Sequence, residues 1–187
     1  MQRHIAFTLL TLVSSSEVFG CSIDDRAALK TFGCSDAQIT KRCDGQATAN
    51  KVTLATLKPV SRPREGVLTG KVGGAPFRVT TPSDGGFYYL KLSSPSDKKG
   101  AVMTMFVNGG SALETKVPIG SYVLRYATGS DWYGQKHLFG PCKTRFFEAQ
   151  SILEFSRSGN RLSGNQIELI KQVGGNLGTA GVDEDDF

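Results

Sequence analysis

The feature that most constrains this chain is a run of short strand-like segments that starts near residue 65 and continues almost to the end of the sequence. Successive side chains of a strand point to opposite faces, so Tyr88, Leu90 and Leu92 share one face of segment 86–92. The opposite face carries Phe87, Tyr89 and Lys91. Similar segments occur at 67–72, 77–80, 101–107, 112–117, 121–127, 152–156 and 166–170. This spacing predicts a mainly β protein whose residues 65–182 form an antiparallel β-sandwich.

Turn residues predict how some of these strands are joined. The chain has 22 glycines and only 7 prolines, a balance that indicates many turns. Segment 73–76 (Gly-Gly-Ala-Pro) predicts a hairpin between the strands on either side of it. Segment 157–160 (Arg-Ser-Gly-Asn) predicts a closing hairpin between strands 152–156 and 166–170.

The four cysteines predict how the N-terminal part is held together. An even number of cysteines in an exported chain indicates two disulfides, for which three pairings exist. Segment 22–25 (Ser-Ile-Asp-Asp) resembles a capping box that begins a first helix, and Gly33 is suited to the position after its end. Segment 35–38 (Ser-Asp-Ala-Gln) resembles a second capping box, for a helix to about Arg42. The two segments therefore predict a small helical hairpin.

The hairpin favours one disulfide pairing. Cys21 precedes the first helix and Cys43 ends the second, so antiparallel helices would place them side by side. Cys34, at the turn, would then reach Cys142. We expect Cys21–Cys43 and Cys34–Cys142. A zinc site is the alternative, but the sequence has no Cys-x-x-Cys pair and no histidine after residue 20 except His137, so no metal or cofactor is expected.

The first 20 residues resemble a secretory signal peptide, with a basic start, an apolar core at 5–13 and a polar end. The apolar core is much shorter than the roughly 20 residues that span a bilayer, and no transmembrane span is expected. Segment 18–20 resembles a signal-peptidase site, which would leave Cys21 as the first mature residue. Segment 18–21 also resembles a bacterial lipobox, in which Cys21 would carry a lipid anchor and Cys34 would pair with Cys43. We expect a periplasmic or secreted protein, with a membrane-anchored lipoprotein as the alternative.

Charge is distributed unevenly along the chain. The formal net charge is +5, but without Arg3, Glu17 and the acidic residues at 183–186 the chain carries 21 basic and 12 acidic residues. The acidic tail could fold back over the basic body, or it could be a frayed, solubilising end, which is the interpretation that we favour. The basic pairs Lys41–Arg42 and Lys98–Lys99 are too isolated for a nucleic-acid stripe, so no nucleic acid is expected as a partner.

The predicted organisation has five parts in chain order. They are a signal peptide (1–20), a Cys-containing helical hairpin (21–45), a linker with one short strand at 52–57 (46–64), the β-sandwich (65–182) and the acidic tail (183–187).

Part of the sandwich resembles a known family. Segment 116–122 reads Lys-Val-Pro-Ile-Gly-Ser-Tyr, in which Pro118 and Gly120 turn the chain and Tyr122 re-enters the core. This resembles the Val-Pro-x-Gly-x-Tyr step of prealbumin-like and carboxypeptidase-regulatory-like β-sandwich modules, and 117–141 is also similar to uncharacterised bacterial exported proteins. The resemblance implies a binding or structural accessory module more often than a catalytic one.

Candidate functional residues concentrate in the connection 125–142. It holds the only Trp of the chain, and long loops with aromatic and charged residues are where binding sites usually lie. We select Arg125, Trp132, Tyr133, Lys136 and His137 as candidate binding residues. We expect Tyr133, Lys136 and His137 to be exposed, whereas Trp132 could instead cap one end of the sandwich.

The sequence thus predicts a non-catalytic binding or structural accessory protein of the bacterial cell envelope, which recognises an unknown protein or envelope polymer through this loop. One alternative is a small secreted enzyme that uses His137 with a carboxylate such as Asp131 or with the thiol of Cys142. The other alternative is a lipoprotein subunit of an envelope assembly, anchored at Cys21.

Overall fold

The structure is a computed structural model that describes residues 21–44, 54, 57–169 and 178–187. The predicted signal peptide lies outside the described residues. So does most of the predicted short strand at 52–57. Within the described part, no helix is both long and apolar enough to cross a membrane.

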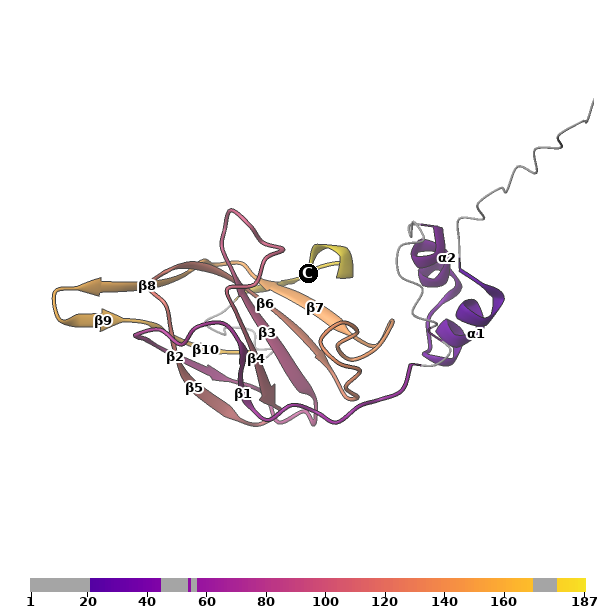
Figure 1. The fold of residues 1–187 in the computed structure, drawn as a ribbon, viewed down its shortest axis with the longest axis horizontal. Helices are drawn as coiled ribbons and strands as arrows, with labels where there is room; N and C mark the ends of the chain where they lie inside the picture. Colours follow the sequence, from indigo (N-terminus) through magenta and orange to yellow (C-terminus); the bar gives the residue numbers. More distant parts are fainter. Residues whose placement is uncertain (1–20, 45–53, 55–56, 170–177) are drawn as a thin grey trace, which may run out of the picture.

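The N-terminal part is a helical hairpin of α1 (Ile23–Thr31) and α2 (Asp36–Asp44), which lies at one end of the sheets (Figure 1). The Ser22 hydroxyl accepts a hydrogen bond from the Asp25 N–H at 3.1 Å, and the Asp25 carboxylate accepts one from the Ser22 N–H. Ser35 begins α2 with Gln38 as its reciprocal partner. Both predicted capping boxes are therefore confirmed, because each satisfies backbone N–H groups that the first turn leaves unpaired.

Two disulfides secure the hairpin. Cys21 and Cys43 are joined with their Cα atoms 4.9 Å apart, and Cys34 is joined to Cys142 across 108 residues of sequence. Both predicted pairings are confirmed. Leu29 and Ile39 form the small core between the helices. The second disulfide joins the hairpin to the connection between β6 and β7, and such cross-links are common where a small part has little core of its own.

The larger sheet has the strand order β1-β4-β3-β6-β7-β11, with β8 paired to β6 and β9 paired to β8. Its strands are β1 (Gly66–Thr69), β3 (Phe87–Ser93), β4 (Met103–Asn108), β6 (Gly120–Gly129), β7 (Arg145–Ala149), β8 (Leu153–Ser158), β9 (Arg161–Ser163) and β11 (Thr179–Gly181). The smaller sheet has the order β10-β2-β5, from β2 (Ala75–Thr80), β5 (Ala112–Val117) and β10 (Asn165–Glu168). All pairs are antiparallel except β10 with β2.

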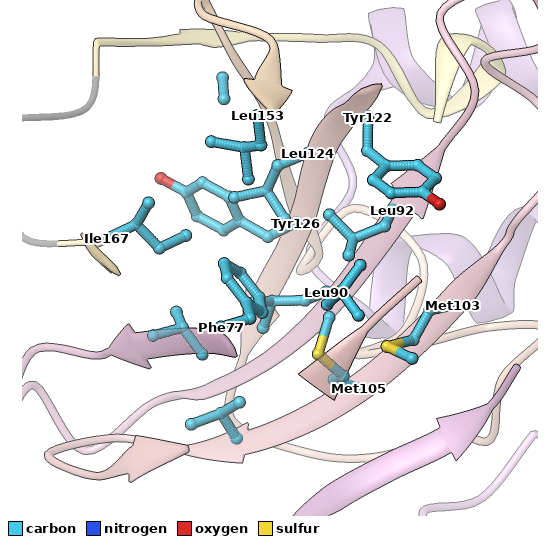
Figure 2. Packing of buried hydrophobic residues seen from close by; sticks show 14 of the residues in the cluster. Phe77, Leu90, Leu92, Met103, Met105, Tyr122, Leu124, Tyr126, Leu153 and Ile167 are labelled. Carbon is cyan, nitrogen blue, oxygen red and sulfur yellow. The ribbon is translucent and has the colours of Figure 1, made fainter. Parts of the chain in front are cut away.

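The main hydrophobic core lies between the two sheets, as expected for a sandwich (Figure 2). The larger sheet contributes the predicted inner face of β3, together with Tyr122, Leu124 and Tyr126 of β6. The smaller sheet contributes Phe77 and Ile167, which point toward these side chains. The antiparallel β-sandwich is therefore confirmed, with one parallel pair that the alternation did not indicate.

The larger sheet is also covered on its outer face. Tyr89 of β3 and Phe106 of β4 are buried there beneath Trp132 and Phe139 of the connection that follows β6. Burial on both faces explains why β4 is an almost continuous apolar run instead of an alternating one. The sandwich thus has a third layer on this side, made of loop and tail residues.

Both predicted hairpins are wrong in their pairing. β1 pairs with β4, and the chain then crosses at 73–74 to the smaller sheet, where β2 pairs with β5. A Cβ on Gly73 would lie 2.1 Å from the Pro118 backbone nitrogen, so this crossing needs a residue without a side chain. At the far end β8 turns back into β9, whereas β10 leaves to pair with β2.

Besides β9, two further strands were not anticipated, and the tail takes the alternative arrangement, folded back over basic residues of the body. β7 lies beside β6, and β11 adds to the outer edge of β7. The prediction of a frayed acidic end is wrong, because Asp183 and Glu184 form ion pairs with Lys41 and Arg42 of α2. The C-terminal residues therefore lie between the larger sheet and the helical hairpin (Figure 1).

Candidate functional site

The connection between β6 and β7 is tightly folded, not an open loop. The Tyr133 N–H donates to the Leu138 carbonyl and the Leu138 N–H donates to the Gly134 carbonyl, each at 2.7 Å. Leu138 and Cys142 have φ values of 46° and 59°, a left-handed backbone that residues other than glycine rarely adopt. Such conformations persist only where surrounding contacts fix them, so this connection is held rigidly against the sheet.

Trp132 is a structural residue of the third layer. Its side chain is 4% exposed, and its ring centroid lies 5.3 Å from that of Phe106 and 5.4 Å from that of Phe139. Its carbonyl accepts a hydrogen bond from the Val60 N–H, which ties the end of the linker to the same face. The structural alternative for Trp132 thus fits, although Trp132 covers the outer face of the sheet and not an end of the sandwich.

Tyr133 is buried, so the prediction that it is exposed is wrong. Its ring packs edge-to-face on Phe32 of the hairpin at a centroid distance of 5.5 Å. The contact lies in the same cluster as Cys34 and Cys142, so it supports the joint between hairpin and loop. Burial raises the pKa of the Tyr133 phenol, which keeps the group neutral.

Arg125 is also buried, at 5% exposure, on the outer face of β6. Its Nε donates to Glu148 of β7 at 2.7 Å, and its Nη1 donates to the Lys98 carbonyl at 3.1 Å and to the Asp186 carbonyl. The Lys98 ammonium, followed by Arg125, lowers the pKa of the Glu148 carboxyl. Arg125 therefore joins two strands, a turn and the tail, and its charge is compensated.

Lys136 is exposed and His137 is half-buried at the rim of a small pocket. The pocket has a volume of about 220 Å³, and Lys91, Phe146 and Phe187 are among its other lining residues. Burial, then the nearby charges of Lys136 and Arg42, lower the pKa of the His137 imidazole. The ring is therefore neutral at pH 7, and either nitrogen can take part in hydrogen bonds with a ligand.

Lys91, which was not selected from the sequence, is the most unusual group of this pocket. Its side chain is 7% exposed on the outer face of β3, where its Nζ donates to backbone oxygens of Lys99, at 3.2 Å, and Phe187. Burial and the neighbouring Arg125 lower the pKa of this ammonium. Its place among Phe87 and Tyr89 in an alternating strand was the signal available in the sequence, since lysine is rarely buried on an apolar face.

A second, larger depression lies on the exposed face of the smaller sheet. Its volume is about 500 Å³. Arg78 and Glu114 both line it and form an ion pair, with Nη1 of Arg78 2.5 Å from Oε1 of Glu114. The residues that line it belong largely to strands whose side chains point alternately to this exposed face and to the core, as in β2. We therefore place the candidate site at the smaller pocket, where buried and exposed polar groups converge.

The described residues contain no cluster of three or more His, Cys, Asp or Glu side chains that could hold a metal ion. Cys142 is in a disulfide and has no thiol, so the hypothesis that it acts as a nucleophile is wrong. Asp131 lies exposed near Ser130 and accepts a hydrogen bond from its hydroxyl.

No family model, no curated protein and no solved structure matches this chain. The resemblance to prealbumin-like modules stays a prediction. The candidate site therefore rests on its own geometry.

Proposed function

We propose that this chain is an exported, non-catalytic binding or accessory protein of the cell envelope or the extracellular space, which recognises its partner at the pocket beside Lys136 and His137. The observation that carries the proposal is the convergence at this pocket of an exposed cation, a neutral imidazole and the buried ammonium of Lys91. A concave site with a few fixed polar groups on an apolar floor is the usual form of a ligand site.

The disulfides support the compartment. Disulfides persist in oxidising surroundings and are rare in the cytosol, so the two in this chain fit an exported or extracellular protein. The signal-like segment at 1–20 supports the same assignment.

The surroundings of His137 favour binding over catalysis. A histidine base is normally oriented by a carboxylate, but the charges that act on this ring come from Lys136 and Arg42. Among the hydrogen bonds of the described residues, none joins the His137 ring to a carboxylate. The enzyme hypothesis with His137 as base therefore has less support.

The lipoprotein alternative is testable by mass. The Cys21–Cys43 disulfide uses the sulfur to which a thioether-linked lipid would be attached, so the two states exclude each other. We expect the intact mass of the exported protein to fit an unlipidated chain that begins at Cys21 and has lost four hydrogens to two disulfides. A diacylglyceryl-modified mass would contradict this.

The binding proposal is tested by retention of envelope components on the immobilised protein. We expect wild type and the control variant Arg161→Glu, altered at exposed β9, to retain the same component. The double variant Lys136→Glu/His137→Ala should lose it, because both changes alter the rim of the pocket. Equal retention by the double variant would reject this site.

A further inference from the structure

The last five residues of the sequence occupy a basic surface that four separate side chains form. We call this surface the basic seat and define it as Lys41 and Arg42 of α2, Lys91 of β3 and Arg125 of β6. These residues come from three elements that are far from residues 183–187 in sequence. The seat is therefore a property of the folded body, and the tail docks onto it.

Each basic residue of the seat contacts the tail. Lys41 Nζ lies 2.9 Å from the Asp183 carboxylate, and Arg42 pairs with Glu184. Deeper in the seat the cations donate to backbone oxygens. Arg125 donates to the carbonyl of Asp186, and Lys91 donates to a backbone oxygen of Phe187. The outer half of the seat thus binds acidic side chains, and the inner half binds backbone.

An aromatic residue fixes the end of the tail. The Phe187 ring lies 4.9 Å from the Phe146 ring and 6.3 Å from the Tyr89 ring, measured between centroids. The Lys91 ammonium lies 5.0 Å from the centroid of the same ring, within the range of a cation–π contact. The seat thus contacts an acidic segment and the aromatic side chain that follows it.

The outermost contact of the tail is its weakest one. The pair Lys41–Asp183 is largely solvent-exposed, and such pairs contribute little to stability because water screens them. The 3-10 helix η2 (Glu184–Asp186) has no side-chain hydrogen bond at its N-cap. Beneath the tail lie two cations, Lys91 and Arg125, whose side chains are nearly inaccessible while it stays in place. Removing the tail would leave both without one of their oxygen partners, so a second segment that offers backbone oxygens at this place would be favoured there.

We propose that the basic seat is a peptide-binding site for an acidic segment followed by an aromatic residue, that residues 183–187 occupy it in cis, and that a partner protein presents such a segment in competition with them. The inference rests on the proposed function, because Lys91 and Phe187 line the same pocket as Lys136 and His137. The inference specifies the chemistry of the segment that the partner presents. It also implies that the tail of this chain competes with that segment for the same site.

Competition by the tail lowers the apparent affinity for an external segment by a factor that can be measured. A tail that closes the seat in about nine of ten molecules lowers the apparent affinity for an external segment about tenfold, since only open molecules bind. Weakening the tail should therefore tighten the binding of an external peptide by about that factor.

The experiment uses the full chain and a labelled peptide with the sequence of 178–187 (Gly-Thr-Ala-Gly-Val-Asp-Glu-Asp-Asp-Phe), followed by fluorescence anisotropy. We expect the tail-weakened variant Glu184→Gln/Phe187→Ser to bind the peptide about tenfold more tightly than wild type. In that background Lys91→Met should abolish binding. Lys41→Gln should weaken it, and because this side chain is exposed, the change tests the seat even if Lys91→Met does not fold. Arg161→Gln is the matched control and should leave binding unchanged.

Two results would overturn the inference. One is an affinity that is the same in wild type and in the tail-weakened variant. The other is a peptide with Ser in place of its final Phe, or polyglutamate, that competes as well as the original peptide, because that would indicate binding by charge alone. If peptide binding fails while the envelope component is still retained through Lys136 and His137, the inference falls and the proposed function stands.

Discussion

Arg125 and Glu148 are register partners on β6 and β7, and the Nε and Nη2 atoms of Arg125 each lie 2.7 Å from Oε2 of Glu148. The pair lies on the outer face of the larger sheet, beneath the C-terminal tail, where Lys98 donates to the other carboxylate oxygen. The pair therefore joins two strands, and through Arg125 it also contacts the tail. Since its acid is held ionised by two cations, its stabilising effect must depend on pH.

Glu148→Gln should destabilise the protein by about 1.5 to 3 kcal/mol at pH 7, the usual range for hydrogen bonds to a charged group. The folded pKa of Glu148 is lowered, first by Lys98 and then by Arg125, so the unfolded chain takes up the proton first. Its contribution is complete above the ordinary glutamate pKa of about 4.3 and is lost as pH falls through the lower folded pKa. Urea unfolding between pH 7 and 3 measures this. The difference between wild type and Glu148→Gln should shrink at acid pH, whereas that for Arg161→Gln should stay constant.

Trp132→Ala should cost about 3 to 5 kcal/mol, because it would leave a cavity among Tyr89, Phe106 and Phe139. Lys136→Ala, four residues along the same connection, changes an exposed side chain and should alter stability by less than about 0.5 kcal/mol. Urea unfolding of the two variants makes the comparison. A Trp132→Ala protein as stable as wild type would contradict a structural role for this residue.

Removal of the Cys34–Cys142 disulfide by paired serine substitution should cost more than removal of Cys21–Cys43. The two bridges span 108 and 22 residues, and a longer closed loop restricts the unfolded chain more. The chain-entropy relation gives about 4 to 5 kcal/mol for the long loop and about 3 kcal/mol for the short one. Denaturation of the two double-serine variants tests this order, and the reverse order would show that native contacts of the hairpin dominate.

His137 should titrate below the ordinary histidine pKa of about 6.5, because burial and then the charges of Lys136 and Arg42 disfavour its protonation. The unfolded state takes up the proton first, so the His137 contribution to stability decreases as pH falls below about 6.5. NMR titration of the ring measures the midpoint, with the signal assigned by its loss in His137→Gln. Lys136→Gln should raise the midpoint and Arg161→Gln should not. An unchanged midpoint in Lys136→Gln would mean that this lysine does not act on the ring.

Much of the fold could be predicted because it depends on local signals. The inner faces of β3 and β6 were recognised from alternation, since a strand buried on one face alternates by geometry. The capping boxes at Ser22 and Ser35 placed both helices, and the helices in turn placed the cysteines for pairing. The strand pairing was less accessible, because β1 and β2 are joined by a turn-like segment and yet belong to different sheets.

The candidate site was predicted only in part. The connection after β6 was selected as an unusual segment, and Lys136 and His137 of this connection lie at the rim of a pocket. Trp132 and Tyr133 belong instead to the packing of the sheet and the hairpin. An aromatic residue in a polar loop has the same sequence signature whether it binds a ligand or covers a sheet, because the surface it meets is supplied by distant segments.

The sequence by itself thus determined the secondary structure class and the two capped helices, since each follows from neighbours within a few residues, and the positions of the helices in turn favoured the disulfide pairing. Only the tertiary structure decided where the acidic tail lies and which residues it contacts. The excess of basic residues in the body and the acidity of residues 183–186 can be counted in the sequence. Attraction between charges acts over a distance, however, so it does not define a register, that is, which residue pairs with which. The folded sheet provides that register, because β3, β6 and α2 bring Lys91, Arg125, Lys41 and Arg42 to one place where Phe187 can pack.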